Sequence, residues 1–200
     1  MDKEIKLFNK WSFRDIIVSD PGLKDYISLR PIIIPRTNGY YHNMSYYKQK
    51  VNIVERLANR LMVPGHKGKK HFLTSGHMTG KGKLVTKIVK EAFEIIEKRT
   101  KQNPIQVLVT AIENAAPVEE VITIERSGAK YAQAVDISPL RRVNLVLKFL
   151  TQGAYHKSFN SSKSIVESLV EEILDCYNLG GQSMAINKKI EIEKMAASAK

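Results

Sequence analysis

Apolar residues recur every three or four positions from Val51 to the end of the chain, in six separate segments. Side chains with this spacing lie on one face of a helix, so each segment is predicted to bury that face in a core. The predicted inward-facing residues are Ile53, Val54, Leu57 and Leu61, then Val85, Ile88, Val89, Ala92 and Ile96, then Ile105, Leu108, Val109 and Ile112, then Val143, Val146, Leu147 and Leu150, then Leu169, Ile173 and Cys176, with a last helix from Met184 to about Ala197.

Capping residues and helix breakers set the predicted ends of these helices. Asn and Ser side chains accept hydrogen bonds from first-turn amides, and proline suits the first turn because its missing N–H would have no partner there. The predicted starts are Asn103-Pro104, Ser138-Pro139, Ser164 with Glu167 as a capping box, and Ser183. The predicted stops are Pro64-Gly65, Pro117, Gly153 and Gly180-Gly181.

Two extended runs interrupt the helical pattern between the third and fourth helices. Val121 to Glu125 and Tyr131 to Ile137 are rich in β-branched and aromatic residues, and Ser127-Gly128 supplies a turn between them. The runs predict a β-hairpin, which we expect to lean on the helices or on a partner because an isolated hairpin is marginally stable in water. The chain is therefore predicted to be mainly α-helical with one hairpin.

Residues 1–50 carry a different pattern from the rest. Pro31 and Pro35 bracket the β-like apolar run Ile32 to Ile34, which argues against a long helix. We predict an N-terminal extension that lies, partly extended, on a surface, followed by one helical domain over residues 51–200.

Composition and charge narrow the class of partner. Of the 200 residues, 43% are hydrophobic, enough for one substantial core, and the formal net charge is +12. An excess of cations attracts polyanions, so nucleic acid and anionic membranes are the candidate partners. No apolar run reaches the ~20 residues of a membrane-spanning helix, and the N-terminus lacks the apolar stretch of a signal peptide. Cys176 stands alone, so no disulfide framework is expected and a reducing, cytosolic setting is favoured.

The stretch between Glu55 and Glu91 contains no carboxylate. Its five glycines leave backbone amides accessible, and lysine with accessible amides is the usual combination for binding phosphate. The alternative is a solvated loop whose charge serves solubility. The cations of the stretch are Arg56, Arg60, Lys67, Lys69, Lys70, Lys81, Lys83, Lys87 and Lys90.

Two further groups are candidates for contact with an anionic polymer. Arg141 and Arg142 lie in the first turn of the fourth predicted helix, where backbone amides already attract phosphate; an ordinary surface pair is the alternative.

The second group lies near the end of the extension, where four tyrosine rings are interleaved with positive charge. These rings either stack on unpaired bases or pack the extension onto the core, and the sequence leaves both open. The residues concerned are Tyr40, Tyr41, Tyr46 and Tyr47, with Arg36, His42, Lys48 and Lys50.

The sequence offers no convincing catalytic, cofactor or metal site. Gly76 to Gly82 fails as a nucleotide-hydrolase phosphate loop, because its glycine spacing is one residue short and no Ser or Thr follows Lys81. Three histidines of the same loop are conceivable zinc ligands, but without a second cysteine we favour phosphate or base contact; they are His66, His71 and His77. The acidic residues of the fifth helix are predicted to form a solvated outer face; they are Glu167, Glu171, Glu172 and Asp175.

Several stretches resemble the universal small-subunit ribosomal protein seven family, whose eukaryotic members are called protein five. The closest resemblance lies in NPIQVLVTAIENAAP (103–117) and AVDISPLRRV (134–143). IVERLANRLM, GKLVTKIVKEAFEII and AINKKIEIEKMAASAK also match, in the right order, so the resemblance covers Val51 to Lys200. The segment ahead of it, with KLFNKW and YISLRPIIIPRTNGYYH, resembles the archaeal form.

The resemblance implies a six-helix bundle with a protruding β-hairpin at about 118–137. It implies a structural constituent of the cytoplasmic small ribosomal subunit, not an enzyme, that binds rRNA directly and nucleates assembly of the subunit head. Such a protein lies near the decoding centre among neighbouring small-subunit proteins, with its hairpin facing exit-site tRNA and the mRNA exit path. The implied hairpin contacts are Arg126, Ser127, Gly128, Lys130 and Tyr131, and the implied rRNA contacts are Arg56, Arg60, Lys67, Lys69, Lys70, Lys81, Lys83, Lys87, Arg141 and Arg142.

Three positions depart from the family pattern. Val118 stands where relatives usually have arginine, which weakens the hairpin base as an RNA contact. The turn is Ser127-Gly128 rather than a pair of glycines, and His71 to Gly80 looks like an insertion, so family contacts do not transfer to it.

Two other classes of function are alternatives to this one. A DNA-binding regulator would read a major groove with the fourth predicted helix, but it needs a dimer surface, and the sequence shows no heptad seam. An RNA-modifying enzyme would need a cofactor-binding loop, which the sequence lacks.

Overall fold

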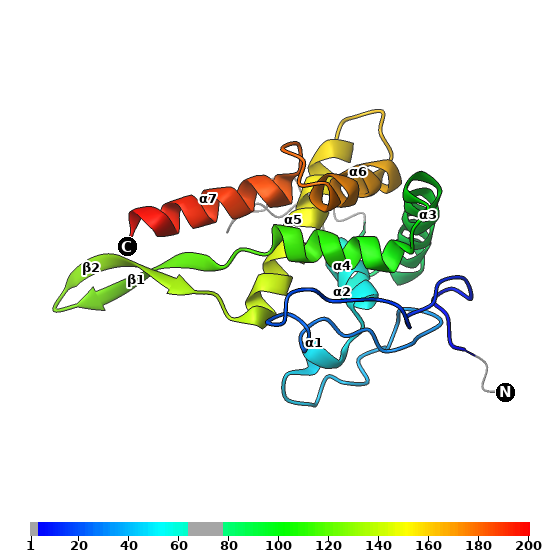
Figure 1. The fold of residues 1–200 in the computed structure, drawn as a ribbon, viewed down its shortest axis with the longest axis horizontal. Coiled ribbons are helices and arrows are strands. Elements are labelled where there is room, and N and C mark those ends of the chain that lie inside the picture. Colours follow the sequence, from blue (N-terminus) through cyan, green and yellow to red (C-terminus); the bar gives the residue numbers. More distant parts are fainter. Residues whose placement is uncertain (1–3, 64–77) are drawn as a thin grey trace.

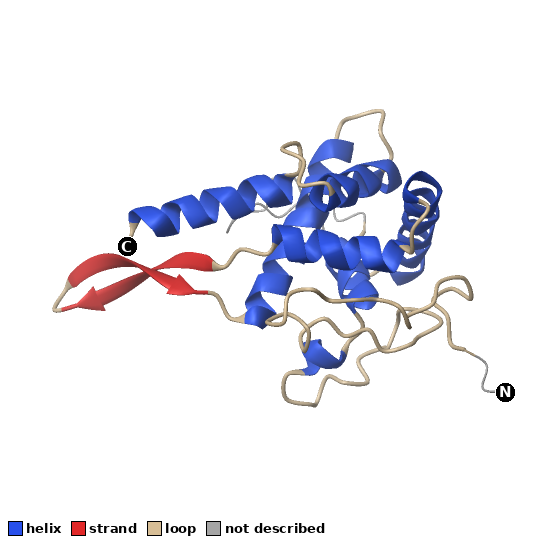
Figure 2. Cartoon of the chain, viewed as in Figure 1, coloured by secondary structure: helices blue, strands red, loops and turns tan. Residues whose placement is uncertain are grey.

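The computed structural model describes residues 4–63 and 78–200, which form seven helices and one two-stranded antiparallel sheet (Figure 1). The centre of the helical body is α6 (Ile165–Tyr177), which contacts α3 (Gly82–Thr100), α4 (Pro104–Ala115) and α5 (Pro139–Ser158). Against α3 and α5 lies α2 (Ile53–Leu61), and α7 (Met184–Ser198) runs out from the body beside the strands (Figure 2). The prediction of a mainly helical protein with a hairpin is confirmed. The single turn α1 (Tyr47–Lys50) was not predicted.

The helices form where local signals predicted them. Every inward-facing residue predicted for the first five helices is buried. Asn103 Oδ1 accepts a hydrogen bond from the Ile105 amide at 3.1 Å, and Ser183 Oγ accepts one from the Ala185 amide at 3.1 Å. Ser164 and Glu167 form the predicted capping box, which satisfies two backbone amides at once.

Gly153, predicted to end the fourth helix, is instead an interior residue of α5, which continues to Ser158. A Cβ atom at this position would lie 2.7 Å from the carboxyl carbon of Glu172 on α6. Glycine therefore serves close packing of two helices here. The prediction that Gly153 ends the helix is wrong because glycine is needed here for contact with Glu172, which lies in a distant part of the chain.

Glu172 itself corrects the prediction of a solvated acidic face. Its side chain is completely buried, and its Oε1 accepts hydrogen bonds from Ser183 Oγ at 2.9 Å and from the Ala185 amide at 3.2 Å. Lys157 Nζ lies 2.8 Å from Oε2. The charge is compensated inside the body, as a buried carboxylate requires.

Replacing Gly153 with alanine is expected to destabilise the protein. In an unobstructed helix alanine is favoured over glycine by about 0.5–1 kcal/mol, but here the new methyl group overlaps the Glu172 carboxyl group. Overpacking of this kind costs about 1–3 kcal/mol, measurable by urea denaturation followed by circular dichroism. Gly82→Ala is the control, because a Cβ there meets Arg36 at an ordinary 3.5 Å. Greater stability of Gly153→Ala would contradict the packing argument.

The N-terminal segment shares the core of the helices. Five of its apolar side chains are buried in the common hydrophobic cluster, namely Leu7, Trp11, Phe13, Leu23 and Ile27. The outer face of α4 holds the segment by polar contacts: the Gln106 side chain accepts from the Ile17 amide at 2.8 Å and donates to the Ile17 carbonyl at 3.0 Å. The apolar run Ile32 to Ile34 forms no strand in the described chain, and Ile33 and Ile34 are 48% and 61% exposed.

The hairpin pairs β1 (Glu119–Arg126) with β2 (Ala129–Asp136), from Glu119 opposite Asp136 to Arg126 opposite Ala129. Ser127 and Gly128 both have positive φ, 51° and 79°, as a two-residue type I′ turn requires. The strands project from the body with α7 alongside (Figure 1). Lys200 Nζ contacts Glu119 Oε1 at 2.7 Å, and α7 packs against both strands. Of the two supports expected for the hairpin, the helices or a partner, a helix therefore provides one.

Candidate nucleic-acid interface

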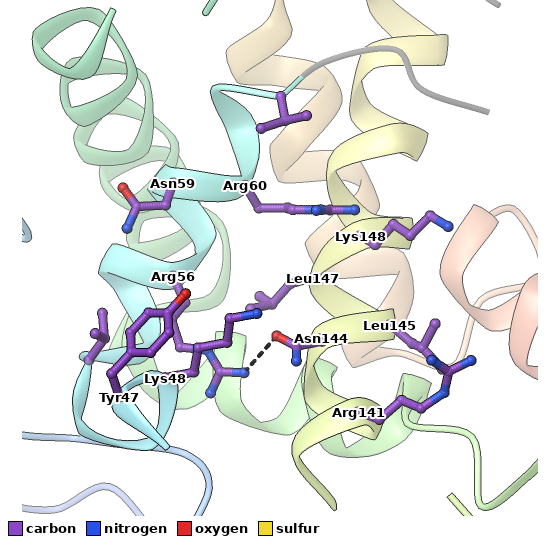
Figure 3. Close-up of a pocket in the computed structure, with 12 residues that line it drawn as sticks. Tyr47, Lys48, Arg56, Asn59, Arg60, Arg141, Asn144, Leu145, Leu147 and Lys148 are labelled. Atoms are coloured by element: carbon purple, nitrogen blue, oxygen red, sulfur yellow. Dashed lines mark hydrogen bonds between the residues drawn. The ribbon is translucent and has the colours of Figure 1, made fainter. Parts of the chain in front are cut away.

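A basic hollow of about 490 Å³ opens between α1, α2 and α5 (Figure 3). Helical spacing places its cations on facing turns: Arg60 extends from α2 toward α5, which carries Arg141 and Lys148. Of the twelve lining residues five are cationic and none is acidic; the cations are Lys48, Arg56, Arg60, Arg141 and Lys148.

The cations of this basic hollow crowd one another. Burial lowers the pKa of Lys148, and the positive charges of Arg60 and Arg141 lower it further. Burial also lowers the pKa of Arg60. Like charges repel, and none of the lining residues is acidic. An anion bound in the hollow would therefore reduce the repulsion between these cations.

Arg56, one of the predicted RNA contacts, has mainly internal partners. It is 7% exposed, and its guanidinium donates to the Tyr26 carbonyl at 2.8 Å and to Asn144 Oδ1 at 3.2 Å (Figure 3). Burial lowers the pKa of Arg56 to about 10, which leaves it cationic at neutral pH. Arg56 thus links the N-terminal segment to α5 by hydrogen bonds, and its buried guanidinium contributes positive charge to the hollow.

The paired arginines at the start of α5 have different environments. Arg141 is exposed, lines the basic hollow and binds Glu120 of β1 with Nε at 2.6 Å and Nη2 at 2.7 Å, a contact that raises the pKa of Arg141. Arg142 is half-buried: it pairs with Asp20 at 3.1 Å and donates to the Pro117 carbonyl at 3.0 Å. Arg142 therefore joins the N-terminal segment to the hairpin base, and only Arg141 faces the hollow.

A second basic group surrounds the beginning of α3. Lys81 and Lys83 are exposed and line a shallow hollow of about 430 Å³ together with Arg36. Lys87 is exposed one turn further along and lies 3.7 Å from Glu91. The remaining predicted loop contacts lie outside the described residues, as do the three histidines; they are Lys67, Lys69, Lys70, His66, His71 and His77.

The predicted hairpin residues lie at the far end of the molecule from α2 (Figure 1). Ser127 and Gly128 form the exposed turn, and Lys130 and Tyr131 are exposed next to it on β2, with the Tyr131 ring 58% exposed. Arg126 is the last residue of β1. The structure thus separates these residues from the basic hollow, with the Arg141–Glu120 pair at the hairpin base between the two regions.

Sequence reasoning missed three polar residues of the basic hollow, and one of them had a detectable signal. Lys148 follows Arg141 by seven residues, which is two helical turns, so the two share a face of α5. The other two, Asn59 and Asn144, are uncharged and belong to no charge pattern. Lys48, which the sequence placed with the tyrosines, also lines the hollow.

Within residues 4–63 and 78–200 no group of three or more His, Cys, Asp and Glu side chains is arranged to hold a metal ion. Cys176 is buried, and burial raises the pKa of its thiol to about 12, which leaves it unreactive. None of the described helices has the combination of length and hydrophobicity that crossing a membrane requires.

Comparison with known proteins identifies the family. The family model described as ribosomal protein S7p/S5e matches residues 23–200. The small ribosomal subunit protein uS7 of Nanoarchaeum equitans (strain Kin4-M) is 53% identical over 197 residues, covering 98% of this chain and all of the relative. The resemblance predicted from the sequence is confirmed: this chain belongs to the ribosomal protein S7p/S5e family, with a structural rather than catalytic role in the cytoplasmic small ribosomal subunit.

Proposed function

We propose that this protein binds small-subunit rRNA directly, with RNA phosphates occupying the basic hollow. The observation that carries the proposal is the gathering of Arg60 and Lys148, beside Arg141 with its partner Glu120, in a recess whose described lining contains no acidic side chain. Phosphate contacts by arginine and lysine fix a protein on folded RNA without reading its sequence. The exposed lysines at the start of α3 extend the same charge, and Lys67, Lys69 and Lys70 remain predicted contacts.

The proposal extends to the role of the protein in the subunit. The protein nucleates assembly of the subunit head near the decoding centre, in contact with neighbouring ribosomal proteins. Its helices α2 to α7 are the six-helix bundle of the family, which binds rRNA through residues 51–200, while residues 1–50 lie on an rRNA or protein surface. Residues 118–137 face exit-site tRNA and the mRNA exit path, which the exposure of Lys130 and Tyr131 supports.

Replacing Arg60 and Lys148 together with glutamine is expected to weaken binding of head rRNA and to flatten its salt dependence. Each lost phosphate contact should reduce the slope of log affinity against log salt by roughly 0.7–0.9, so two contacts remove about 1.5. Filter binding of a head-domain rRNA transcript at several salt concentrations measures both quantities. Lys98→Gln with Lys101→Gln is the matched control, because it removes the same charge from exposed positions outside the hollow.

An equal slope for the two double variants would place the RNA elsewhere on the protein. A duplex DNA competitor provides the second comparison. Displacement of head rRNA by duplex DNA at equal concentration would favour the DNA-binding alternative over an rRNA-specific role.

A further inference from the structure

Four of the eight tyrosines of the chain lie within residues 40–47, and most of their rings face solvent. Tyr40 is 74% exposed, Tyr46 72% and Tyr47 38%, while Tyr41 is half-buried. Packing the N-terminal segment onto the core therefore does not explain these rings. Large exposed rings are typical of a binding site, because burying each would be favourable.

The surroundings of these rings are cationic. The Arg30 guanidinium lies 5.8 Å from the centre of the Tyr41 ring, and Lys48 Nζ lies 5.9 Å from the centre of the Tyr47 ring. No aspartate or glutamate occurs from residue 26 to residue 54. A partner at this surface must therefore tolerate positive charge and offer flat faces to aromatic rings.

The group of tyrosines reaches the basic hollow at Tyr47. Tyr47 and Lys48 line the hollow together with Arg60 and Arg141 (Figure 3). Tyr46 directly precedes them in a left-handed backbone conformation, with φ 53° and ψ 32°. A bulky residue adopts this conformation at a steric cost, and the Tyr46 side chain is exposed next to the residues that line the hollow.

We propose that Tyr40, Tyr46 and Tyr47 form a stacking platform for unpaired RNA bases whose phosphates enter the basic hollow. The inference rests on the proposed RNA-binding function and adds the kind of RNA that is bound. Bases in a duplex are already stacked on one another, so rings of a protein stack only on bases in loops, bulges or single strands. Stacking accepts any base because each has a π-face, so this platform selects unpaired RNA rather than a sequence.

Leucine and phenylalanine variants separate stacking from other roles of these rings. Tyr40→Leu with Tyr46→Leu keeps an apolar side chain without a π-face, whereas Tyr40→Phe with Tyr46→Phe keeps the face and removes only the hydroxyl. The full-length variants are titrated with a head-domain rRNA transcript and with a short uridine oligoribonucleotide, whose bases stack little on one another. The leucine variant should bind each RNA on the order of tenfold more weakly per stacked base, with the salt slope unchanged because no phosphate contact is lost. The phenylalanine variant should bind like the wild type.

A second measurement identifies the contact itself. Ultraviolet crosslinking of the wild-type complex, followed by mass spectrometry, should place nucleotides on the peptide that contains residues 40–47. If the wild type binds head rRNA and the leucine variant binds it equally well, the platform is disproved while the proposed function stands. If the wild type fails to bind head rRNA even at low salt, the proposed function itself fails. Loss of a neighbouring ribosomal protein from subunits, with rRNA affinity intact, would assign the rings to a protein partner and overturn the inference.

Discussion

Replacing Trp11 with alanine is expected to lower the free energy of unfolding by about 3–5 kcal/mol, as for other large aromatic residues in cores. The Trp11 ring is only 4% exposed. It packs edge-to-face against Phe93 of α3 at 5.7 Å between ring centres and against Phe8 at 6.1 Å. The cost is large because the alanine variant leaves a cavity between the N-terminal segment and α3 that neither side can close alone.

Urea denaturation followed by circular dichroism measures this effect without relying on the lost indole. Ile17→Ala is the control: it lies in the same segment but is 70% exposed, so its replacement should change the free energy by less than about 0.5 kcal/mol. Trp11 is the single tryptophan of the chain, so wild-type fluorescence reports directly on this segment. Fluorescence that changes at lower urea than the helical signal would show that the segment detaches before the body unfolds.

The second large effect is expected at Glu172, where replacement by alanine should cost about 3 kcal/mol of unfolding free energy. The substitution removes the acceptor for the Ser183 hydroxyl and the Ala185 amide at the start of α7. It also leaves Lys157 with Asp175 as its remaining acidic partner, at 3.1 Å. Several polar groups would then be left without adequate partners in or near the core.

The neighbouring Glu171 provides a matched control. Glu171 is half-buried and pairs with Lys163 at 2.8 Å, and partly exposed pairs of this kind contribute about 1 kcal/mol or less. Glu172→Gln should fall between the two alanine variants, because its amide oxygen still accepts the hydrogen bonds to α7. Equal thermal denaturation midpoints for Glu171→Ala and Glu172→Ala would disprove a structural role for the buried carboxylate.

Features governed by nearby residues were predictable from the sequence. The caps at Asn103, Ser164 and Ser183 depend on side chains two or three residues from the amides they bind, so the pattern alone located those helix starts. The hairpin followed from two β-branched runs and a turn at the right spacing. The inward-facing residues were predicted correctly because side chains spaced three or four residues apart lie on one face of a helix, and that face is the buried one.

Features governed by distant residues were not predictable in this way. The role of Gly153 depends on Glu172, which a different helix brings within contact. Arg141 and Arg142 are adjacent in sequence, yet successive helix positions point in directions about 100° apart, so one reaches the hollow and the other pairs with Asp20. The core contacts of Trp11 could not be read from a segment without periodicity.

The candidate interface shows the same division. Concentrated charge predicted a polyanion partner, and part of that charge does gather in the basic hollow. The hollow itself depends on how α1, α2 and α5 come together, and no single segment encodes that arrangement. Lys148 was identified as part of the site only from the structure, although its spacing of seven residues from Arg141 is present in the sequence.

The last residues of α7 lie beside the base of the hairpin, where Lys200 contacts Glu119. A fluorescent dye attached through a cysteine introduced near the end of this helix would therefore be close to the strands, while the opposite end of the molecule carries the first described residues (Figure 1). Energy transfer from such a dye to a labelled transfer RNA would test the proposed approach of tRNA to the hairpin without altering the turn. Affinity tags are better attached at the amino end.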